Sequence, residues 1–244
     1  MLIINADDWG RSAAETDAAF KCYRGRRITS VSAMVFMQDS NRAARLAKDC
    51  ELDDVGLHLN FSEEFTDKSC SETLKEHQGR IIRFLKRSKY AQLLYNPFLR
   101  KAFAYCYYAQ VEQFVRLFEK LPSHIDGHHH MHLCANLLLS KLIPIGMKLR
   151  RNFSFWPGEK SILNRTYRWL VDRWLASRYR LTDYFFDLTQ CVQGKKLDRV
   201  AALAKSSNVE LMTHPTVSAE KAFLMSDEFK AIWQHLEIGG YALV

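Results

Sequence analysis

Two adjacent aspartates and a group of histidines are the residues of this sequence whose types and spacing suggest chemistry. Asp7 and Asp8 follow a short apolar run, and five of the nine histidines lie within residues 124–132. His58 and His214 each end an apolar run of their own. Carboxylates and imidazoles are ligands that zinc and related divalent ions take in proteins. The pattern therefore predicts a metal site assembled from segments that are far apart in the chain.

The segment 124–132 differs most from an ordinary soluble sequence. In an extended chain alternate side chains share a face, so Asp126, His128 and His130 are predicted to point together. Gly127 would let the backbone turn sharply toward a bound ion. A purely structural interpretation stays open for each residue, because an aspartate can cap a helix and a single histidine can be a hydrogen-bonded core residue. Their shared position at strand ends favours the metal site.

The elements that must position these residues alternate between short apolar runs and helix-periodic segments. This alternation predicts an α/β fold with a parallel sheet. The predicted strands are residues 2–5, 31–36, 55–60, 124–128, 148–153, 184–188, 209–214 and 241–244. The predicted helices are residues 13–23, 41–47, 102–121, 133–143, 162–176 and 219–236. Because the carboxyl ends of strands build the active sites of β/α barrels, we predict one such domain over residues 1–244, with an insertion at about 61–100.

Length and composition agree with a single barrel and argue against several classes of protein. A chain of 244 residues is close to the roughly 250 of a β/α barrel. The net charge of +8 comes from scattered Lys and Arg, so no nucleic-acid partner is expected. No apolar run reaches the roughly 20 residues that a membrane helix needs. The six cysteines are widely spaced without a C-x-x-C pair, which is typical of reduced thiols in a cytoplasmic protein.

Four segments resemble motifs of the YdjC/ChbG family of carbohydrate deacetylases, in the order of that family. They are Asn5-Ala6-Asp7-Asp8-Trp9-Gly10, Gly56-Leu57-His58-Leu59-Asn60, the block from Pro122 to His132, and Glu210-Leu211-Met212-Thr213-His214-Pro215. The resemblance implies a distorted β/α barrel of the polysaccharide-deacetylase type. It also implies removal of an N-acetyl group from an amino sugar, such as a unit of a chito-oligosaccharide, with a divalent metal ion, zinc or magnesium, as cofactor.

The resemblance further implies a role for each matched residue. Asp8, His58 and His128 would be the metal ligands. Asp7 would be the general base that accepts a proton from the attacking water. His214 would be the general acid that protonates the departing amine. We also expect a carbohydrate substrate, a cytoplasmic location and a homodimer.

Other residues have less defined expectations. Asp126, His130 and His132 would orient ligands or contact substrate. No family motif matches residues 61–100 or 152–183, where loops that line the substrate are expected. An aromatic and basic group there could form a sugar platform with a polar anchor, or could only pack between helix and barrel: Arg150, Phe153, Phe155 and Trp156.

Two other functions fit the same residues. A metal hydrolase on a similar barrel, such as a phosphoesterase, would use the same ion on a different substrate. A basic binding protein without catalysis would use the histidines for a closed structural zinc site.

Overall fold

The computed structural model describes residues 1–244, and its strands form one six-stranded sheet. The strands are β1 (Leu2–Trp9), β2 (Ser30–Ala33), β3 (Val55–Leu59), β4 (Ile125–Gly127), β5 (Tyr184–Asp187) and β6 (Val209–Thr213). Their order is β4-β3-β2-β1-β6-β5, and the pairs β1–β6, β5–β6 and β3–β4 are parallel. The predicted α/β class with a parallel sheet is confirmed, in the form of a distorted barrel with fewer strands than the eight of a regular one.

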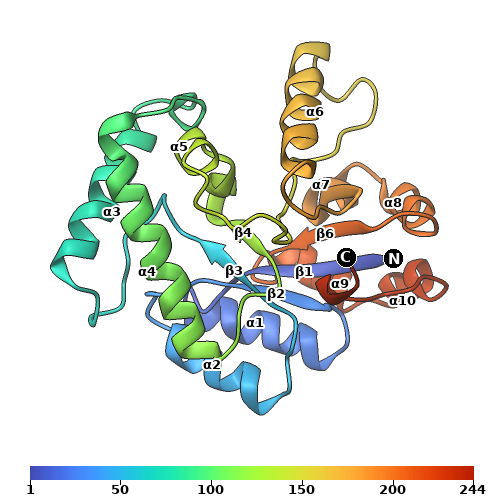
Figure 1. Cartoon of the computed structure of the whole chain (residues 1–244). Helices are drawn as coiled ribbons and strands as arrows, with labels where there is room; N and C mark the ends of the chain where they lie inside the picture. Colours follow the sequence, from blue (N-terminus) through green and yellow to red (C-terminus); the bar gives the residue numbers. More distant parts are fainter. The chain divides into compact units, whose positions relative to one another are not determined.

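Helices connect the strands along the chain (Figure 1). The α-helices are α1 (Ala13–Arg24), α2 (Ser40–Asp49), α3 (Glu72–Leu85), α4 (Arg100–Phe118), α5 (Ala135–Leu139), α6 (Ile162–Ala176), α7 (Leu188–Gln193), α8 (Leu197–Ala204), α9 (Ser218–Leu224) and α10 (Asp227–Trp233). The 3₁₀ helices are η1 (Ala91–Leu93), η2 (Pro97–Leu99), η3 (His128–Leu133) and η4 (Tyr241–Leu243). None of these helices is long and apolar enough to cross a membrane.

The chain divides into two compact units, which we describe separately. Unit 1 comprises residues 1–7, 17–31 and 145–244, and unit 2 comprises residues 8–16 and 32–144. The chain first passes from unit 1 to unit 2 within β1, between Asp7 and Asp8. The prediction of one catalytic domain over residues 1–244 stays a prediction.

In unit 2, the region of the predicted insertion contains a regular helix. Ser71 caps α3, because its side chain accepts a hydrogen bond from the backbone N–H of Leu74. Buried apolar residues recur along one face of α3 at helical spacing, and this face packs against α4 (Figure 1). The rings of His77 and Tyr105 meet across the pair with centroids 4.9 Å apart. The charged composition and Gly79 concealed this helix in the sequence.

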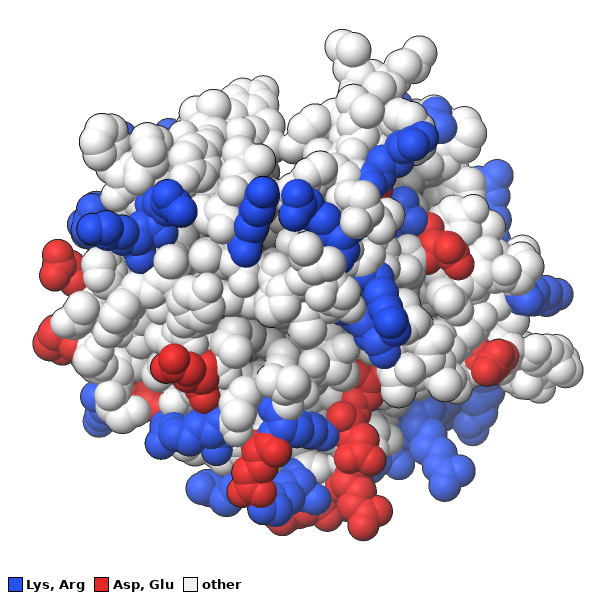
Figure 2. Space-filling view, in the orientation of Figure 1, with Lys and Arg blue, Asp and Glu red and all other residues white.

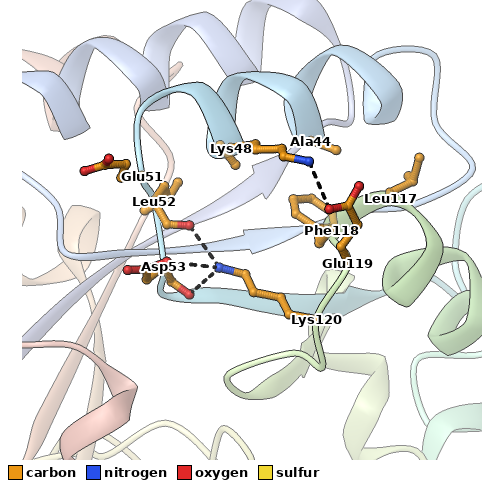
Figure 3. Close-up of a pocket in the computed structure, with 10 residues that line it drawn as sticks. Ala44, Lys48, Glu51, Leu52, Asp53, Leu117, Phe118, Glu119 and Lys120 are labelled. Carbon is orange, nitrogen blue, oxygen red and sulfur yellow. Dashed lines mark hydrogen bonds and ion pairs between the residues drawn. The ribbon is translucent and has the colours of Figure 1, made fainter.

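Unit 2 also contains a pocket of about 400 Å³ between α2 and the end of α4 (Figure 3). Its charged side chains already have partners within the pocket. Lys48 Nζ lies 2.9 Å from Glu119 Oε2, and Lys120 Nζ donates to the carbonyl oxygen of Asp53 at 2.8 Å. These lysines therefore have little unpaired charge with which to bind a ligand in the pocket.

Unit 1 corrects three predicted elements. Residues 148–153 are not a strand, because Lys148 forms only an isolated bridge with Arg180. Residues 241–244 are not a strand either, since they follow Gly240 and turn into η4. The predicted helix 219–236 is broken into α9 and α10, because the side chain of Ser226 caps a new helix by accepting from the N–H of Phe229.

The distribution of surface charge and the state of the cysteines agree with the composition. Figure 2 shows Lys and Arg in small groups with Asp and Glu between them on the face in view. All six cysteines are free. Burial raises the pKa of Cys106, Cys134 and Cys191 to about 12, so these thiols are poor nucleophiles at neutral pH.

Candidate active site

Strand β1 carries both aspartates, and its backbone is unusual at the second one. Every residue of β1 is buried. Asp8 has a φ of +66°, in the left-handed region that non-glycine residues rarely occupy. Such a conformation costs about 1–3 kcal/mol and persists only where the surrounding structure imposes it, commonly at functional sites.

The three predicted metal ligands come together in unit 2. Asp8, His58 and His128 are buried, and one ligand atom from each lies within 4.8 Å of the other two. His128 Nδ1 is 2.9 Å from Asp8 Oδ1, and His58 Nε2 is 3.5 Å from the same oxygen. The structure therefore brings one carboxylate and two imidazoles to a single point from β1, β3 and the start of η3.

The electrostatics of this group suit a cation. Burial acts to raise the pKa of Asp8, but the adjacent imidazoles of His128 and His58 outweigh burial and hold it well below its usual range. Asp8 Oδ1 and His128 Nε2 are buried, and their contacts with His128 Nδ1 and Glu63 Oε1 lie within ion-pair distance without hydrogen-bond geometry. Unsatisfied lone pairs of this kind are costly unless an ion or a donor completes them. The donor set therefore fits a divalent ion such as zinc.

A second carboxylate, which the sequence analysis missed, lies beside His128. Glu63 Oε1 is 3.2 Å from His128 Nε2, and the Arg11 guanidinium holds Glu63 with bonds of 2.8 and 3.1 Å. Burial acts to raise the pKa of Glu63, but His128 and Arg11 together lower it below its ordinary value. Its position shortly after the end of β3 is the signal that could have identified it.

Asp126 orients His58. Its Oδ1 lies 2.8 Å from His58 Nδ1, and its side chain is fully buried. A carboxylate on one ring nitrogen fixes the tautomer and leaves the other nitrogen free to bind a metal. The predicted orienting role of Asp126 therefore agrees with its position.

The predicted extended geometry of residues 126–130 is wrong. His129 and His130 have φ values of 51° and 57°, so the chain turns into η3 directly after β4 and His130 does not continue a strand face. Gly127 is itself extended, with φ −167°. A side chain there would place its Cβ 2.8 Å from the backbone nitrogen of His132, so glycine is needed for a close approach and not for a turn.

In unit 1, Asp7 is held by a buried guanidinium. Arg150 Nη1 and Nη2 each lie 2.7 Å from one carboxylate oxygen of Asp7, and Arg150 Nε lies 2.7 Å from Glu210 Oε1. Asn5 Nδ2 donates to Asp7 Oδ1 at 2.8 Å. The hypothesis that Arg150 is a polar anchor for sugar is therefore not supported, because its guanidinium is buried between two carboxylates.

His214, the predicted general acid, lies beside two carboxylates in unit 1. One ligand atom each of Asp187, His214 and Glu220 fall within 4.8 Å of one another. Glu220 accepts from the backbone N–H of His214 at 2.5 Å and from Thr213 Oγ1 at 2.6 Å. Burial raises the pKa of Asp187, and the nearby charge of Asp7 adds to this rise.

The predicted aromatic platform packs largely against β5. Phe153 stacks on Phe185 with centroids 4.6 Å apart, and Trp156 stacks on Phe186 at 4.5 Å. Phe155 lies beneath the cation of Arg168 at 5.1 Å. These contacts favour the packing interpretation of Phe153 and Trp156.

The fold and the donor group define an α/β protein with a candidate metal centre at its strands. A family model described as YdjC-like protein matches residues 1–235, and the chain belongs to this family.

The chain is similar to proteins named chitooligosaccharide deacetylase. That of Proteus mirabilis (strain HI4320) is 28% identical over 228 residues, which cover 88% of this chain and 81% of the relative. That of Yersinia pestis (strain Pestoides F) is 29% identical over 140 residues, which cover 56% of this chain and 52% of the relative.

A solved structure from Enterococcus faecalis V583, which carries the provisional name cellobiose-phosphate cleavage protein, resembles the whole chain. The TM-score is 0.69 at 17% identity, over 99% of this chain and 97% of that one. At this identity the likeness concerns the fold alone.

Proposed function

We propose that this protein is a metal-dependent carbohydrate deacetylase, which hydrolyses the N-acetyl group of an amino sugar and releases acetate and a free amine. The observation that carries the proposal is the meeting of Asp8, His58 and His128 in unit 2, where the buried Oδ1 of Asp8 makes no contact with hydrogen-bond geometry. The names of the Proteus and Yersinia relatives support a carbohydrate amide as the substrate.

The metal ligands of the proposed site are one carboxylate and two imidazoles. When bound, a divalent ion would supply Lewis acidity to the amide carbonyl and to a water molecule. Asp126 keeps the proton on His58 Nδ1, so that Nε2 presents its lone pair. With three protein ligands, such a site would keep a position for water or substrate, unlike a closed structural zinc site, which has four protein ligands.

Asp7 is the proposed general base. The paired hydrogen bonds from Arg150 favour the ionised carboxylate and fix its orientation. Because Asp7 is covalently next to the proposed ligand Asp8, one dipeptide provides a ligand and a proton acceptor. Asp7 would take the proton from the water as its oxygen attacks the acetyl carbon.

His214 is the proposed general acid. Its imidazole would give a proton to the amide nitrogen, so that the C–N bond breaks with a neutral amine as the leaving group. Glu220 fixes the backbone of His214, and Asp187 lies close to the same group. We propose a small N-acetylated sugar or oligosaccharide as substrate, and a homodimer in solution.

An acetate-release assay on N-acetylated mono- and oligosaccharides tests the function. We expect release that stops after treatment with a chelator and returns when zinc, magnesium, manganese, cobalt or nickel is added back. Generic phosphate esters in the same assay test the phosphoesterase alternative. Hydrolysis of the phosphate esters without acetate release, or acetate release that survives complete metal removal, would contradict the proposal.

A further inference from the structure

A continuous chain of hydrogen-bonded side chains extends from the candidate metal centre through the interior of unit 2. Its members, in order, are His58, Asp126, Ser32, His124, Ser123 and Asp54. Asp126 bonds His58 at 2.8 Å through one oxygen and accepts from Ser32 Oγ at 2.7 Å through the other. Thus both oxygens of the carboxylate that orients His58 have a defined partner.

The outer half of the chain reaches the surface. Ser32 Oγ lies 3.0 Å from His124 Nε2, and His124 Nδ1 lies 2.9 Å from Ser123 Oγ. Ser123 in turn donates to Asp54, whose side chain is 12% exposed. The chain therefore connects a buried metal ligand with a partly exposed carboxylate at the start of β3.

The number of available hydrogens determines which group donates and which accepts along this series of hydrogen bonds. A serine hydroxyl has one hydrogen, and that of Ser32 is given to Asp126. The oxygen of Ser32 must then accept from His124, so His124 Nε2 carries a hydrogen. The hydrogen on His124 Nε2 keeps the hydroxyl of Ser32 pointed at Asp126. By the same count, Ser123 gives its hydrogen to Asp54 and accepts from His124 Nδ1, so both ring nitrogens of His124 donate.

The imidazole of His124 fits against strand β3 because residue 56 is a glycine. Gly56 lies against the imidazole of His124, and a Cβ at Gly56 would be only 2.3–2.5 Å from three atoms of that ring. Every residue type other than glycine would displace the imidazole, since real contacts of this kind are never so short. The His124 ring therefore occupies the space that a side chain at position 56 would fill.

We propose that Ser32 and His124 are positioning residues for the metal centre, which hold the Asp126 carboxylate so that His58 presents Nε2 to the ion. The proposal rests on the proposed metal-dependent function. Ser32 bonds Asp126, and His124 bonds Ser32. They act through Asp126, and removal of such an outer partner weakens metal binding by about 10–100-fold in comparable sites.

The test is metal affinity in the absence of substrate. Apo protein is titrated with Zn²⁺ in competition with a chromophoric chelator, for wild type and Ser32→Ala. We expect about 10–100-fold weaker binding by Ser32→Ala, and a changed d–d spectrum of the Co²⁺-loaded variant because the orientation of His58 relaxes. Ser123→Ala, at the outer end, should weaken binding less than Ser32→Ala.

Ser40→Ala is the matched control. Ser40 is a buried serine of the same unit whose hydroxyl donates to the carbonyl of Met34 and accepts from the N–H of Met37. We expect it to bind Zn²⁺ like wild type, with a wild-type Co²⁺ spectrum. Circular dichroism of each apo variant shows whether it is folded.

Folded Ser32→Ala with wild-type affinity and spectrum would overturn the positioning role, as would an equal loss in Ser40→Ala. Wild-type protein that binds Zn²⁺ without releasing acetate from any sugar would count against the proposed function alone, because the affinity ratio is measured without substrate. Wild-type protein without Zn²⁺ affinity would overturn both.

Discussion

Asp7 and Asp8 are adjacent in β1, yet each belongs to a different compact unit and has different basic neighbours. Asp7 in unit 1 has a permanent cation, since Arg150 occupies both of its oxygens. Asp8 in unit 2 lies near two imidazoles, with Arg11 Nη1 3.8 Å from its Oδ2, and its Oδ1 makes no contact with hydrogen-bond geometry. In the proposed mechanism, the aspartate whose oxygens are both held by a guanidinium is the base, and the aspartate beside two imidazoles is the metal ligand.

The backbone conformations of the two residues also differ. Asp8 occupies the left-handed region at φ +66°, whereas Asp7 is not among the residues with positive φ. Strain of this kind is retained where the surroundings impose it. The charge and the backbone therefore both mark Asp8 as the residue with the more specialised position.

The largest effect is expected from removing a ligand in unit 2. Asp8→Ala and His128→Ala should each lose bound metal and lower turnover at least about a thousandfold, because Lewis-acid stabilisation of several kcal/mol disappears. Metal content by elemental analysis and acetate release measure the two effects. The exposed His235 provides a control, since His235→Ala should change neither. Full metal content in the Asp8 variant would show that the comparison assigns the wrong aspartate.

The next largest effect is expected in unit 1 without loss of metal. Asp7→Asn and His214→Ala should each lower turnover by about 10²–10⁴-fold, the usual contribution of a positioned acid or base. Metal content should stay at the wild-type level, because neither side chain belongs to the predicted ligand set. Near-normal turnover would remove the residue from its role, and loss of metal from Asp7→Asn would erase the difference between the two aspartates.

The sequence predicted which side chains meet in unit 2 better than it predicted the residues that support them, and the reason is physical. Asp8, His58 and His128 each lie at or near the end of an apolar run, and parallel strands bring such ends to one edge. Arg150 is 143 residues from Asp7, and its segment, which was predicted as a strand, forms only an isolated bridge at Lys148. A buried ion pair between such distant residues leaves no local pattern.

The fold shows the same division. The helix α4 and the strands β3 and β6 were predictable, because their apolar patterns are long or uninterrupted. The turn at His129 and His130 was not, because its left-handed backbone involves residues other than glycine. Short helices such as α7 depend on a local cap, here Asp187, and carry little periodicity.

Arg150 tests the stability side of the comparison. Arg150→Met should lower the free energy of unfolding by about 3–5 kcal/mol, because it leaves the buried carboxylates of Asp7 and Glu210 without their cation. Chemical denaturation of the metal-free protein measures this effect. The double variant Arg150→Met, Glu210→Gln should recover part of the loss, since one uncompensated charge is removed. A single variant as stable as wild type would mean that Arg150 does not compensate Asp7.

Two glycines of unit 2 give the smallest effects, with opposite signs. Gly56→Ala should destabilise the protein by about 1–3 kcal/mol, because the added Cβ collides with the His124 ring in a closely packed strand. Gly79→Ala, in the middle of α3, meets only the end of a flexible arginine at 3.5 Å, and should stabilise by about 0.5–1 kcal/mol through helix propensity. Denaturant midpoints of both variants measure the difference. Equal and small effects would show that the His124 ring moves aside freely. That result would count against a fixed position of this ring in the hydrogen-bond series that ends at His58.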